Sequence, residues 1–319
     1  MLNCYPMKKN FMSVPRMLAT AWVIVAASVI SAQATEVVLQ DDQLLVAFDT
    51  DSGALTRLEN KAAHWTVERR PELGVSFRLL APLPGRRYNF VLGQRQHAVE
   101  VDKTSSQQVR IKWKDLLSEH GGVLPMAFTT LVTLTNGQLT FEGVLEDNSD
   151  IPVETVEYPY LGDLNPPSRE VVFAAHYVKS GKGGGATSDE LYPHFNNEKG
   201  YWGDFYPTKM LETTPHDLYC LLQAPDEGIC VAMKTNGLPY RLQYYFEQRP
   251  GLISSVNQLV PKEDEIGGVP SHLEFRPCHF VFIGAHSTVT LVPVTLTCYS
   301  GDWHAGVNLY KEQNSAAAQ

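Results

Sequence analysis

Short runs in which apolar and polar residues alternate recur along this chain, and they constrain its fold more than any other feature. The runs are separated by Gly, Pro, Asn and Asp, and no stretch before residue 300 places apolar residues at helical spacing. Alternation with a period of two is typical of a strand with one side in a core. The pattern therefore predicts many strands. The clearest runs are residues 44–48, 74–80, 109–113, 128–135, 139–145, 218–223, 229–234, 240–247, 273–283 and 289–298.

The segment VTLTNGQLTFEG, residues 132–143, predicts a β-hairpin. Asn136-Gly137 supplies the two residues that a type I′ turn needs with positive φ, between two alternating strands. Regular turns and many strands favour an all-β fold, a large antiparallel sandwich of two twisted sheets with a short C-terminal helix. We expect its core to include Leu45, Val75, Phe77, Val132, Leu134, Phe141, Val231, Phe280 and Val292.

The first 34 residues have the layout of a secretory signal peptide. Lys8, Lys9 and Arg16 lie before or beside the apolar run 17–30, and Ala-Gln-Ala at 32–34 forms a cleavage site. The apolar run is shorter than the roughly 20 residues of a spanning helix, which disfavours the alternative of a membrane anchor. We therefore predict cleavage after Ala34, a periplasmic or secreted protein, and no stable membrane anchor.

The chain is acidic, with 26 Lys and Arg against 35 Asp and Glu and a net charge of −9. The predicted signal peptide holds three of the basic residues and none of the acidic ones, so the remainder is more negative still. Nucleic-acid phosphates need a basic patch, so this balance disfavours a nucleic-acid partner. It is compatible with a neutral polymer such as a polysaccharide.

Four cysteines follow the predicted cleavage site: Cys220, Cys230, Cys278 and Cys298. An exported protein can form disulfides, and four cysteines allow three pairings among which the sequence does not choose. Cys220 and Cys230 flank the turn at 225–228, so they could face each other on a hairpin. A chain of this length needs no covalent cross-link to hold a core, which favours four buried thiols.

Residues 179–207 interrupt the rhythm of strands with a Gly-rich start and then a cluster of aromatic and polar residues. Long loops in compact domains are often functional. Aromatic rings offer an apolar face to a sugar, and convergent polar groups bind its hydroxyls. The alternative is that these rings pack the loop onto the sandwich. The predicted sugar-binding residues are Tyr192, His194, Asn196, Tyr201, Trp202, Asp204 and Tyr206.

The same loop holds the carboxyl groups that a glycosidase would need. Such enzymes use a pair of carboxyl groups about 5–9.5 Å apart. Asp189, Glu190, Glu198 and Asp204 lie close enough in sequence to converge. With His194, the residues Glu198 and Asp204 are the candidates for a catalytic role.

Two other sugar chemistries set different requirements. An epimerase needs a His acid and a carboxylate base, for which His176 or His194 pairs with Glu157 or Glu198. A polysaccharide lyase acts on acidic sugars, which the negative net charge disfavours, although a local basic cleft around Arg241 would be compatible with one.

The chain carries no motif that indicates a metal or a nucleotide cofactor. It contains neither HExxH nor CxxC. Residues 49–53 begin like a calcium loop, but the twelfth position is Asn60 instead of Glu, so an Asx turn is expected there. The Gly-rich run 181–187 lacks the residue order of a P-loop.

Three segments carry patterns found together in one family: FDTDSGALTRLENKAAHW at 48–65, VETVEYPYLGDL at 153–164 and GDWHAGVNLYKE at 301–312. They resemble, in turn, an opening strand–turn–strand, a middle strand ending in proline, and a linker helix. Together they resemble a galactose mutarotase-like β-supersandwich domain, as found N-terminal to the TIM barrel of bacterial glycoside hydrolases and related uncharacterised proteins. The resemblance extends over residues 36–312.

The resemblance implies a β-supersandwich over residues 35–300 and a linker helix with a tail over 301–319, leading toward a catalytic barrel that is missing here. In such enzymes the barrel holds the catalytic carboxylates, and the Asn- and His-rich strand motif of aldose epimerases is not found. We therefore expect an exported, carbohydrate-associated module that is non-catalytic by itself. Its expected partners are an oligo- or polysaccharide and a separate TIM-barrel domain. The alternatives are a free-standing aldose epimerase, mutarotase or polysaccharide lyase, and a stand-alone periplasmic glycan-binding protein.

Overall fold

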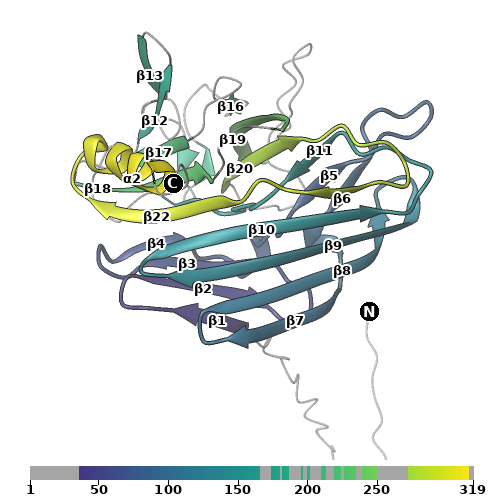
Figure 1. Ribbon diagram of the computed structural model, residues 1–319, viewed down its shortest axis with the longest axis horizontal. Coiled ribbons are helices and arrows are strands. Elements are labelled where there is room, and N and C mark those ends of the chain that lie inside the picture. The colour runs from purple at the N-terminus through teal and green to yellow at the C-terminus, as the bar shows by residue number, and fades with distance from the viewer. Residues whose placement is uncertain are drawn as a thin grey trace, which may run out of the picture. The chain divides into compact units, whose positions relative to one another are not determined.

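Strands account for nearly all the regular structure of the described chain, and an α-helix follows them (Figure 1). The computed structural model describes residues 36–165, 219–223, 226–234, 239–249 and 272–315, together with the backbone of short strands between residues 174 and 212. These residues belong to the second of two units of the chain, Ala34–Gln319. None of the helices in this part has the length and apolar character that a membrane span requires.

A small antiparallel sheet comes first in the chain, with the strand order β1-β2-β3-β4. Its strands are β1 (Glu36–Gln40), β2 (Leu44–Asp49), β3 (Leu55–Asn60) and β4 (Trp65–Glu68). The turn after β2 is closed by Asp49, whose Oδ1 accepts hydrogen bonds from the N–H groups of Asp51 and Ser52 at 3.1 and 2.6 Å. This is the predicted Asx turn. Gly53 follows with φ of 69°, and a Cβ there would lie 2.6 Å from the Trp113 side chain.

A larger antiparallel sheet has the order β13-β12-β17-β18-β22-β10-β9-β8-β6-β5-β11-β20-β19-β16, with β7 paired to β8 and β21 paired to β10. Its strands are β5 (Arg78–Leu80), β6 (Phe90–Leu92), β7 (Ala98–Ser105), β8 (Gln108–Ser118), β9 (Gly122–Thr135), β10 (Gln138–Asp147), β11 (Thr155–Glu157), β12 (Ala174–Lys179), β13 (Lys182–Ala186), β16 (Met210–Glu212), β17 (Tyr219–Gln223), β18 (Glu227–Met233), β19 (Arg241–Arg249), β20 (His272–Phe280), β21 (Thr288–Thr290) and β22 (Val294–Ser300). Strands β14 (Phe195–Asn196) and β15 (Gly200–Tyr201) pair only with each other. Short 3-10 helices are η1 (Pro71–Leu73) and η2 (Gly93–Arg95).

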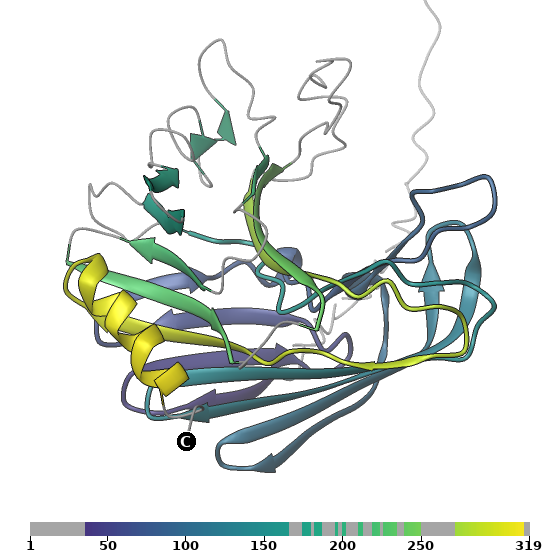
Figure 2. The same cartoon turned by 45° about the horizontal axis from the view of Figure 1, so that its top comes forward.

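The two sheets pack face to face around one core, which makes the described chain an all-β sandwich (Figures 1 and 2). Apolar side chains of the small sheet, such as Leu44 and Val46, belong to the same cluster as Val132, Leu134 and Leu139 of β9 and β10. The predicted fold class is therefore confirmed.

The predicted hairpin is formed by β9 and β10. Asn136 and Gly137 have φ values of 50° and 73°, and Thr135 pairs with Gln138 across the turn. Along β10, Leu139, Phe141 and Leu145 are buried, while the residues between them are more exposed. The alternation in the sequence therefore corresponds to an inner and an outer side of the sheet.

Seven of the nine predicted core residues are buried, and two are not. Val75, Phe77, Val132, Leu134, Phe141, Val231 and Val292 are each less than one tenth exposed. The prediction was wrong for Leu45, which is half-buried because its neighbours Leu44 and Val46 take the inner side of β2. It was also wrong for Phe280, because the inner side of β20 is taken by the odd-numbered residues, including His279.

The helix α2 (Trp303–Ser315) follows β22 and packs back onto the large sheet. Its contact residues are Ala305, Val307, Leu309 and Tyr310, which meet Leu221, Cys230, Ala232 and Tyr299. The rings of Tyr219 and Tyr310 lie 4.6 Å apart. A helix near residues 301–312 was predicted, and its position against β17, β18 and β22 is a finding of the structure (Figure 2).

All four described cysteines are free and buried. In the β17–β18 hairpin, Cys220 lies opposite Val231, and Cys230 lies opposite Leu221. This one-residue offset points the two thiols to opposite sides of the sheet, so they do not meet. The interpretation as buried thiols is confirmed.

Candidate functional site

Most of the sugar-binding residues predicted from the sequence lie outside the described residues. These are Tyr192, His194, Trp202, Asp204 and Tyr206, and the catalytic candidate Glu198 is another. Asn196 and Tyr201 lie on β14 and β15, where Asn196 pairs with Gly200 and Tyr201 pairs with Phe195. Their role in sugar binding stays a prediction.

The described residues contain a different cluster of polar groups, on one side of β5, β11, β20 and β19. The register of the sheet places Glu157 of β11 beside Arg78 of β5 and beside Cys278 of β20. It also places Arg276 beside Tyr245, and Glu274 beside Glu247. The opposite side of these strands belongs to the core. We call the polar side the polar face; its members are Arg78, Glu157, Gln243, Tyr245, Glu247, His272, Glu274, Arg276 and Cys278.

Arg276 lies at the centre of the polar face and contacts three carboxylates. Its Nη2 binds Glu247 Oε2, and its Nη1 donates to Glu274 Oε2 at 3.3 Å. Its Nε lies 2.9 Å from Glu157 Oε2 without the alignment of a hydrogen bond. Burial by itself lowers the pKa of Arg276, but the Tyr160 hydroxyl and the three carboxylates outweigh it and raise that pKa well above its usual value. Arg276 is therefore a permanent cation.

Glu157 is shared between two arginines. Arg78 binds it with two hydrogen bonds, Nε to Oε2 at 2.6 Å and Nη2 to Oε1 at 2.9 Å. This fork geometry is the strongest form of arginine–carboxylate contact. The Arg78 side chain is 17% exposed, whereas that of Arg276 is 2% exposed. The pair therefore links the buried centre of the polar face to its accessible margin. We call Arg78, Glu157, Glu247, Glu274 and Arg276 the carboxylate–arginine cluster.

Aromatic rings and a histidine complete the surroundings of the cluster. The Tyr160 hydroxyl donates to Glu274 Oε2 at 2.6 Å, and the Arg276 guanidinium lies 5.2 Å from the centre of the Tyr160 ring. Burial raises the pKa of Tyr160 well above its usual value, so the hydroxyl keeps its proton. His272 Nε2 lies 3.3 Å from Glu274 Oε1. Glu274 thus contacts an arginine, a tyrosine and a histidine at once.

A row of rings borders the polar face where it meets solvent. Tyr88 and Phe90 are stacked at 6.5 Å, and Phe280 and Phe282 at 6.2 Å. The guanidinium of Arg78 lies over Phe90 at 5.0 Å, and that of the exposed Arg241 lies over Phe280 at 4.9 Å. These contacts place the rings of Phe90 and Phe280, which we call the inner rings, on the polar side of the sheet. We call Tyr88, Phe90, Phe280 and Phe282 the aromatic rim.

A second group of buried polar residues joins the polar face to β4. Glu68 Oε1 accepts hydrogen bonds from the N–H groups of Gly162 and Asp163 at 3.0 and 2.9 Å, and its Oε2 has no hydrogen-bond partner. Burial, and then the charge of Asp163, raise the pKa of Glu68 well above its usual range; Glu274 adds to this. Glu68 therefore holds its proton to a higher pH than an ordinary glutamate does.

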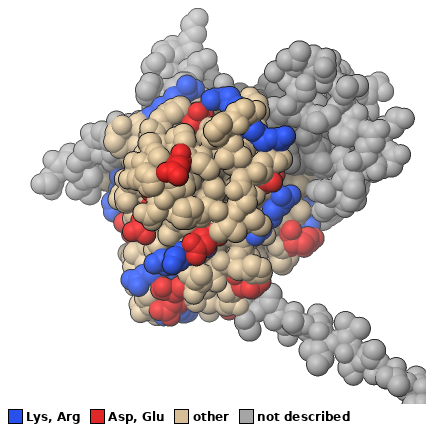
Figure 3. Space-filling model, turned by 90° about the vertical axis from the view of Figure 1, so that its right-hand side faces the viewer, with Lys and Arg blue, Asp and Glu red and all other residues tan. Residues whose placement is uncertain are grey.

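Charge near this end of the sandwich is mixed in sign. Figure 3 views the right-hand side of Figure 1, and its blue and red side chains are interspersed over the coloured surface, with no field of one sign. The two arginines of the cluster are engaged by carboxylates. The part of the described surface that Figure 3 shows therefore has no concentration of positive charge that would favour a polyanion.

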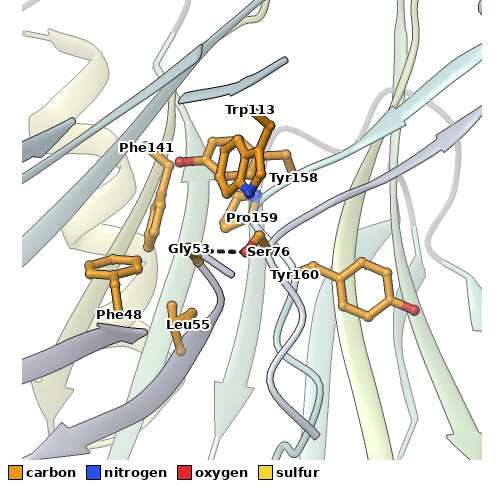
Figure 4. A pocket seen from close by; sticks show the side chains of 9 residues that line it. All are labelled: Phe48, Gly53, Leu55, Ser76, Trp113, Phe141, Tyr158, Pro159 and Tyr160. Carbon is orange, nitrogen blue, oxygen red and sulfur yellow. Dashed lines mark hydrogen bonds between the residues drawn. The ribbon is translucent and has the colours of Figure 1, made fainter. Parts of the chain in front are cut away.

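A small cavity in the core is not the binding site. It lies among Phe48, Trp113, Phe141 and Tyr158, and its volume is about 10 Å³. Figure 4 shows these rings around Gly53, with Tyr160 pointing away from them. Such a volume has room for one water molecule at most, and the lining is apolar. A sugar does not fit there.

The sequence interpretation missed most of the polar face, although it considered Glu157 for an epimerase and Arg241 for a lyase. The signal was present in HLEFRPCHF, residues 272–280, where His272, Glu274 and Arg276 alternate with apolar residues. The sequence interpretation gave residues 273–283 only as an alternating strand. Charged residues that alternate with apolar ones along a strand are equally compatible with a solvent-facing side and with a buried polar side.

No group of three or more His, Cys, Asp or Glu side chains is placed to hold a metal ion within the described ranges. His176, the other epimerase candidate, lies on β12, which pairs with β13 and β17. Glu157 lies on β11, between β5 and β20, so the two candidates are on strands that are not neighbours in the sheet.

No protein-family model matches the chain, and no curated protein sequence matches it. Similar solved structures include a putative aldose 1-epimerase from Escherichia coli K12, with a TM-score of 0.49 at 10% identity over 83% of this chain and 99% of that one. A galactose mutarotase related enzyme from Lactobacillus acidophilus has a TM-score of 0.49 at 11% identity over 84% of this chain and 98% of that one. An alpha-mannosidase from Enterococcus faecalis V583 has a TM-score of 0.46 at 12% identity, over 88% of this chain and 31% of that one. Proteins of the kind that the three sequence motifs resemble are thus among the matches, and the likeness concerns the fold.

Proposed function

We propose that the chain is an exported, non-catalytic carbohydrate-binding β-sandwich domain, and that it binds a neutral sugar at the accessible margin of the polar face. One observation carries the proposal: the aromatic rim and the carboxylate–arginine cluster lie next to each other on one side of the sheet. A sugar presents C–H faces to rings and hydroxyls to charged hydrogen-bonding groups. Both kinds of partner converge here, as in small-molecule sites generally.

The cluster holds its outermost members in place for binding. Arg78 is fixed by two hydrogen bonds to Glu157, and Glu157 is backed by Arg276. Such a network limits the movement of the exposed guanidinium edge, so less side-chain entropy is lost when a ligand binds. Arg241 is the second exposed guanidinium, and it donates to Gln243 Oε1 while it stacks on Phe280.

A neutral sugar is favoured over an acidic one because of charge pairing. Arg78 and Arg276 already contact three carboxylates, so this cluster carries more negative than positive groups. Arg241 adds a third cation at the margin, so the charges of the polar face balance and give an acidic sugar no net attraction. This argues against the hypothesis that the polar face is the active site of a polysaccharide lyase.

A non-catalytic role is favoured because the carboxylates of the cluster are engaged with arginine. A glycosidase needs one carboxylic acid that donates a proton and one carboxylate that acts as nucleophile or base. Glu157, Glu247 and Glu274 each contact Arg276. We therefore propose that catalysis belongs to a separate partner, a TIM-barrel domain, and that residues 1–34 direct export to the periplasm or beyond.

A second candidate function is sugar epimerisation, and the presence of His272 and Glu157 on one face favours it, with Glu274 in contact with the imidazole to orient it. An epimerase moves protons between a histidine and a carboxylate on either side of a ring. His272 Nε2 lies 3.3 Å from Glu274 Oε1, and Glu157 lies on the same face. Polarimetry with freshly dissolved glucose and galactose tests this role. Mutarotation above the uncatalysed rate, lost in His272→Ala, would replace the non-catalytic proposal.

Isothermal titration calorimetry of the full chain with neutral mono- and oligosaccharides tests the binding proposal. Loss of a charged hydrogen-bond donor costs about 1.5–3 kcal/mol, so we expect Arg241→Ala to bind about tenfold more weakly or worse. Arg78→Lys keeps the charge and loses the fork, and should weaken binding as well.

The matched control is Arg110→Ala on β8. Arg110 is an exposed arginine 3.7 Å from Glu100, outside the polar face, and its removal should leave affinity unchanged. If no neutral sugar binds, or if Arg241→Ala and Arg110→Ala have the same effect, the proposal is wrong.

A further inference from the structure

The aromatic rim consists of two separate ring pairs, and each pair has an outer ring that is open to solvent. Tyr88 is 69% exposed and Phe282 is 64% exposed, whereas their stacked partners Phe90 and Phe280 are half-buried. The planes within each pair are inclined by 24° and 26°, so the two rings of each pair are nearly parallel. Contiguous exposed apolar patches often mark a binding surface.

The register of the sheet fixes how far apart the two pairs lie. Phe90 on β6 pairs with Leu80 on β5, and Leu80 pairs with Thr155 on β11. Val156 pairs with His279 on β20, which places Thr155 beside Phe280. Phe90 and Phe280 are therefore separated by three inter-strand steps, or roughly 14 Å at the usual spacing of about 4.8 Å. A single pyranose ring is much shorter than this.

Both pairs extend from the polar face in the same direction. Tyr88 and Phe282 each continue the strand beyond Phe90 and Phe280, on the end that lies away from Arg276. Arg78 and Arg241 lie over the inner rings, at 5.0 and 4.9 Å. These cation–π contacts hold the inner rings and leave the outer rings as the accessible platforms.

We infer that the ligand of this face is a neutral oligosaccharide long enough to stack on both ring pairs at once. The inference rests on the proposed carbohydrate binding and specifies its ligand. One end of the glycan stacks on Tyr88 and the other on Phe282. Its middle units lie over the row that joins the two pairs, where Arg78 offers guanidinium N–H groups to hydroxyls.

The test compares a monosaccharide, a trisaccharide and a pentasaccharide of the same neutral sugar, titrated into the full chain by calorimetry, for gluco-, galacto- and manno-series. We expect the pentasaccharide to bind at least tenfold more tightly than the monosaccharide, because the longer ligand reaches the second ring pair. In the Tyr88→Ala/Phe282→Ala double variant this gain should disappear, so that the pentasaccharide and the monosaccharide bind with similar affinity. Both residues are exposed, so thermal melting should show that the variant folds normally.

The matched control is Trp303→Ala, which removes an exposed ring on α2, 42% accessible, and should not change the dependence on length. Equal affinity for all lengths, or a double variant that keeps the gain, would overturn the inference while leaving the carbohydrate proposal intact. Absence of binding by every sugar would instead defeat the proposed function itself.

Discussion

His279 should make the stability of this protein fall at mildly acidic pH. The ring is fully buried on the core side of β20. Val292 N–H donates to the Tyr240 hydroxyl oxygen at 2.7 Å, so the Tyr240 O–H is left to donate to His279 Nδ1 at 3.0 Å. Nε2 then carries the proton and donates to the Tyr158 carbonyl at 3.0 Å. The neutral ring is fully satisfied, and a second proton has no acceptor.

Burial lowers the pKa of His279 from 6.5 to about 4, and the hydrogen bond to Tyr158 opposes this only in part. The unfolded chain therefore takes up a proton near pH 6.5, and the folded chain does so only near pH 4. Between these values the unfolded state binds more protons, so stability rises with pH. The stabilisation is complete above pH 6.5 and is lost as the pH falls toward 4. At about 1.4 kcal/mol per pKa unit, the loss amounts to about 3 kcal/mol.

Urea unfolding of the full chain at a series of pH values measures this effect, with His279→Gln as the comparison. Glutamine can donate to the Tyr158 carbonyl but does not titrate. Other buried groups titrate in both proteins, so only the difference between their free energies of unfolding reports His279. That difference should change by about 3 kcal/mol between pH 7 and pH 4. A difference that stays constant with pH, or an NMR titration of the His279 ring near pH 6.5, would refute the argument.

Three further predictions concern other parts of the fold. Gly53→Ala should lower the free energy of unfolding by about 1–2 kcal/mol or more, because φ is positive there and the Cβ would press on Trp113; a melting curve like that of the wild type would contradict this. Glu157→Gln should cost about 3–5 kcal/mol by urea unfolding, because the buried Arg276 and the half-buried Arg78 lose the carboxylate that they share. Glu59→Gln, at a half-buried pair 3.7 Å from Arg57, should cost about 1 kcal/mol or less, and equal effects would disprove the distinction. Burial raises the pKa of Cys230 to about 12, so none of the four described thiols should react with Ellman's reagent before unfolding, and rapid reaction of the folded protein would show them to be accessible.

The local sequence pattern was enough to predict the strands and their turns. Asn136-Gly137 predicted the β9–β10 hairpin because positive φ at two successive positions is a property of the residues themselves. Asp49 predicted its Asx turn for the same reason, since the side chain binds its own backbone. The side of a strand that faces the core was harder to predict. Leu45 was predicted to be buried, but Leu44 and Val46 are the buried residues of β2. A run of consecutive apolar residues fits both phases equally well.

The candidate site was likewise predictable only in part from the sequence. Alternation in residues 272–280 separates His272, Glu274 and Arg276 from Leu273 and Phe275, and the sequence alone therefore determines that they occupy opposite sides of one strand. Whether the polar side meets water or other charged groups depends on strands distant in sequence. Glu157 and Glu247 reach Arg276 only because β11 and β19 are the neighbours of β20 in the sheet, and Arg78 reaches Glu157 because β5 lies beside β11. Pairing between distant strands is a property of the assembled sheet, and so only the tertiary structure decided that these charges meet.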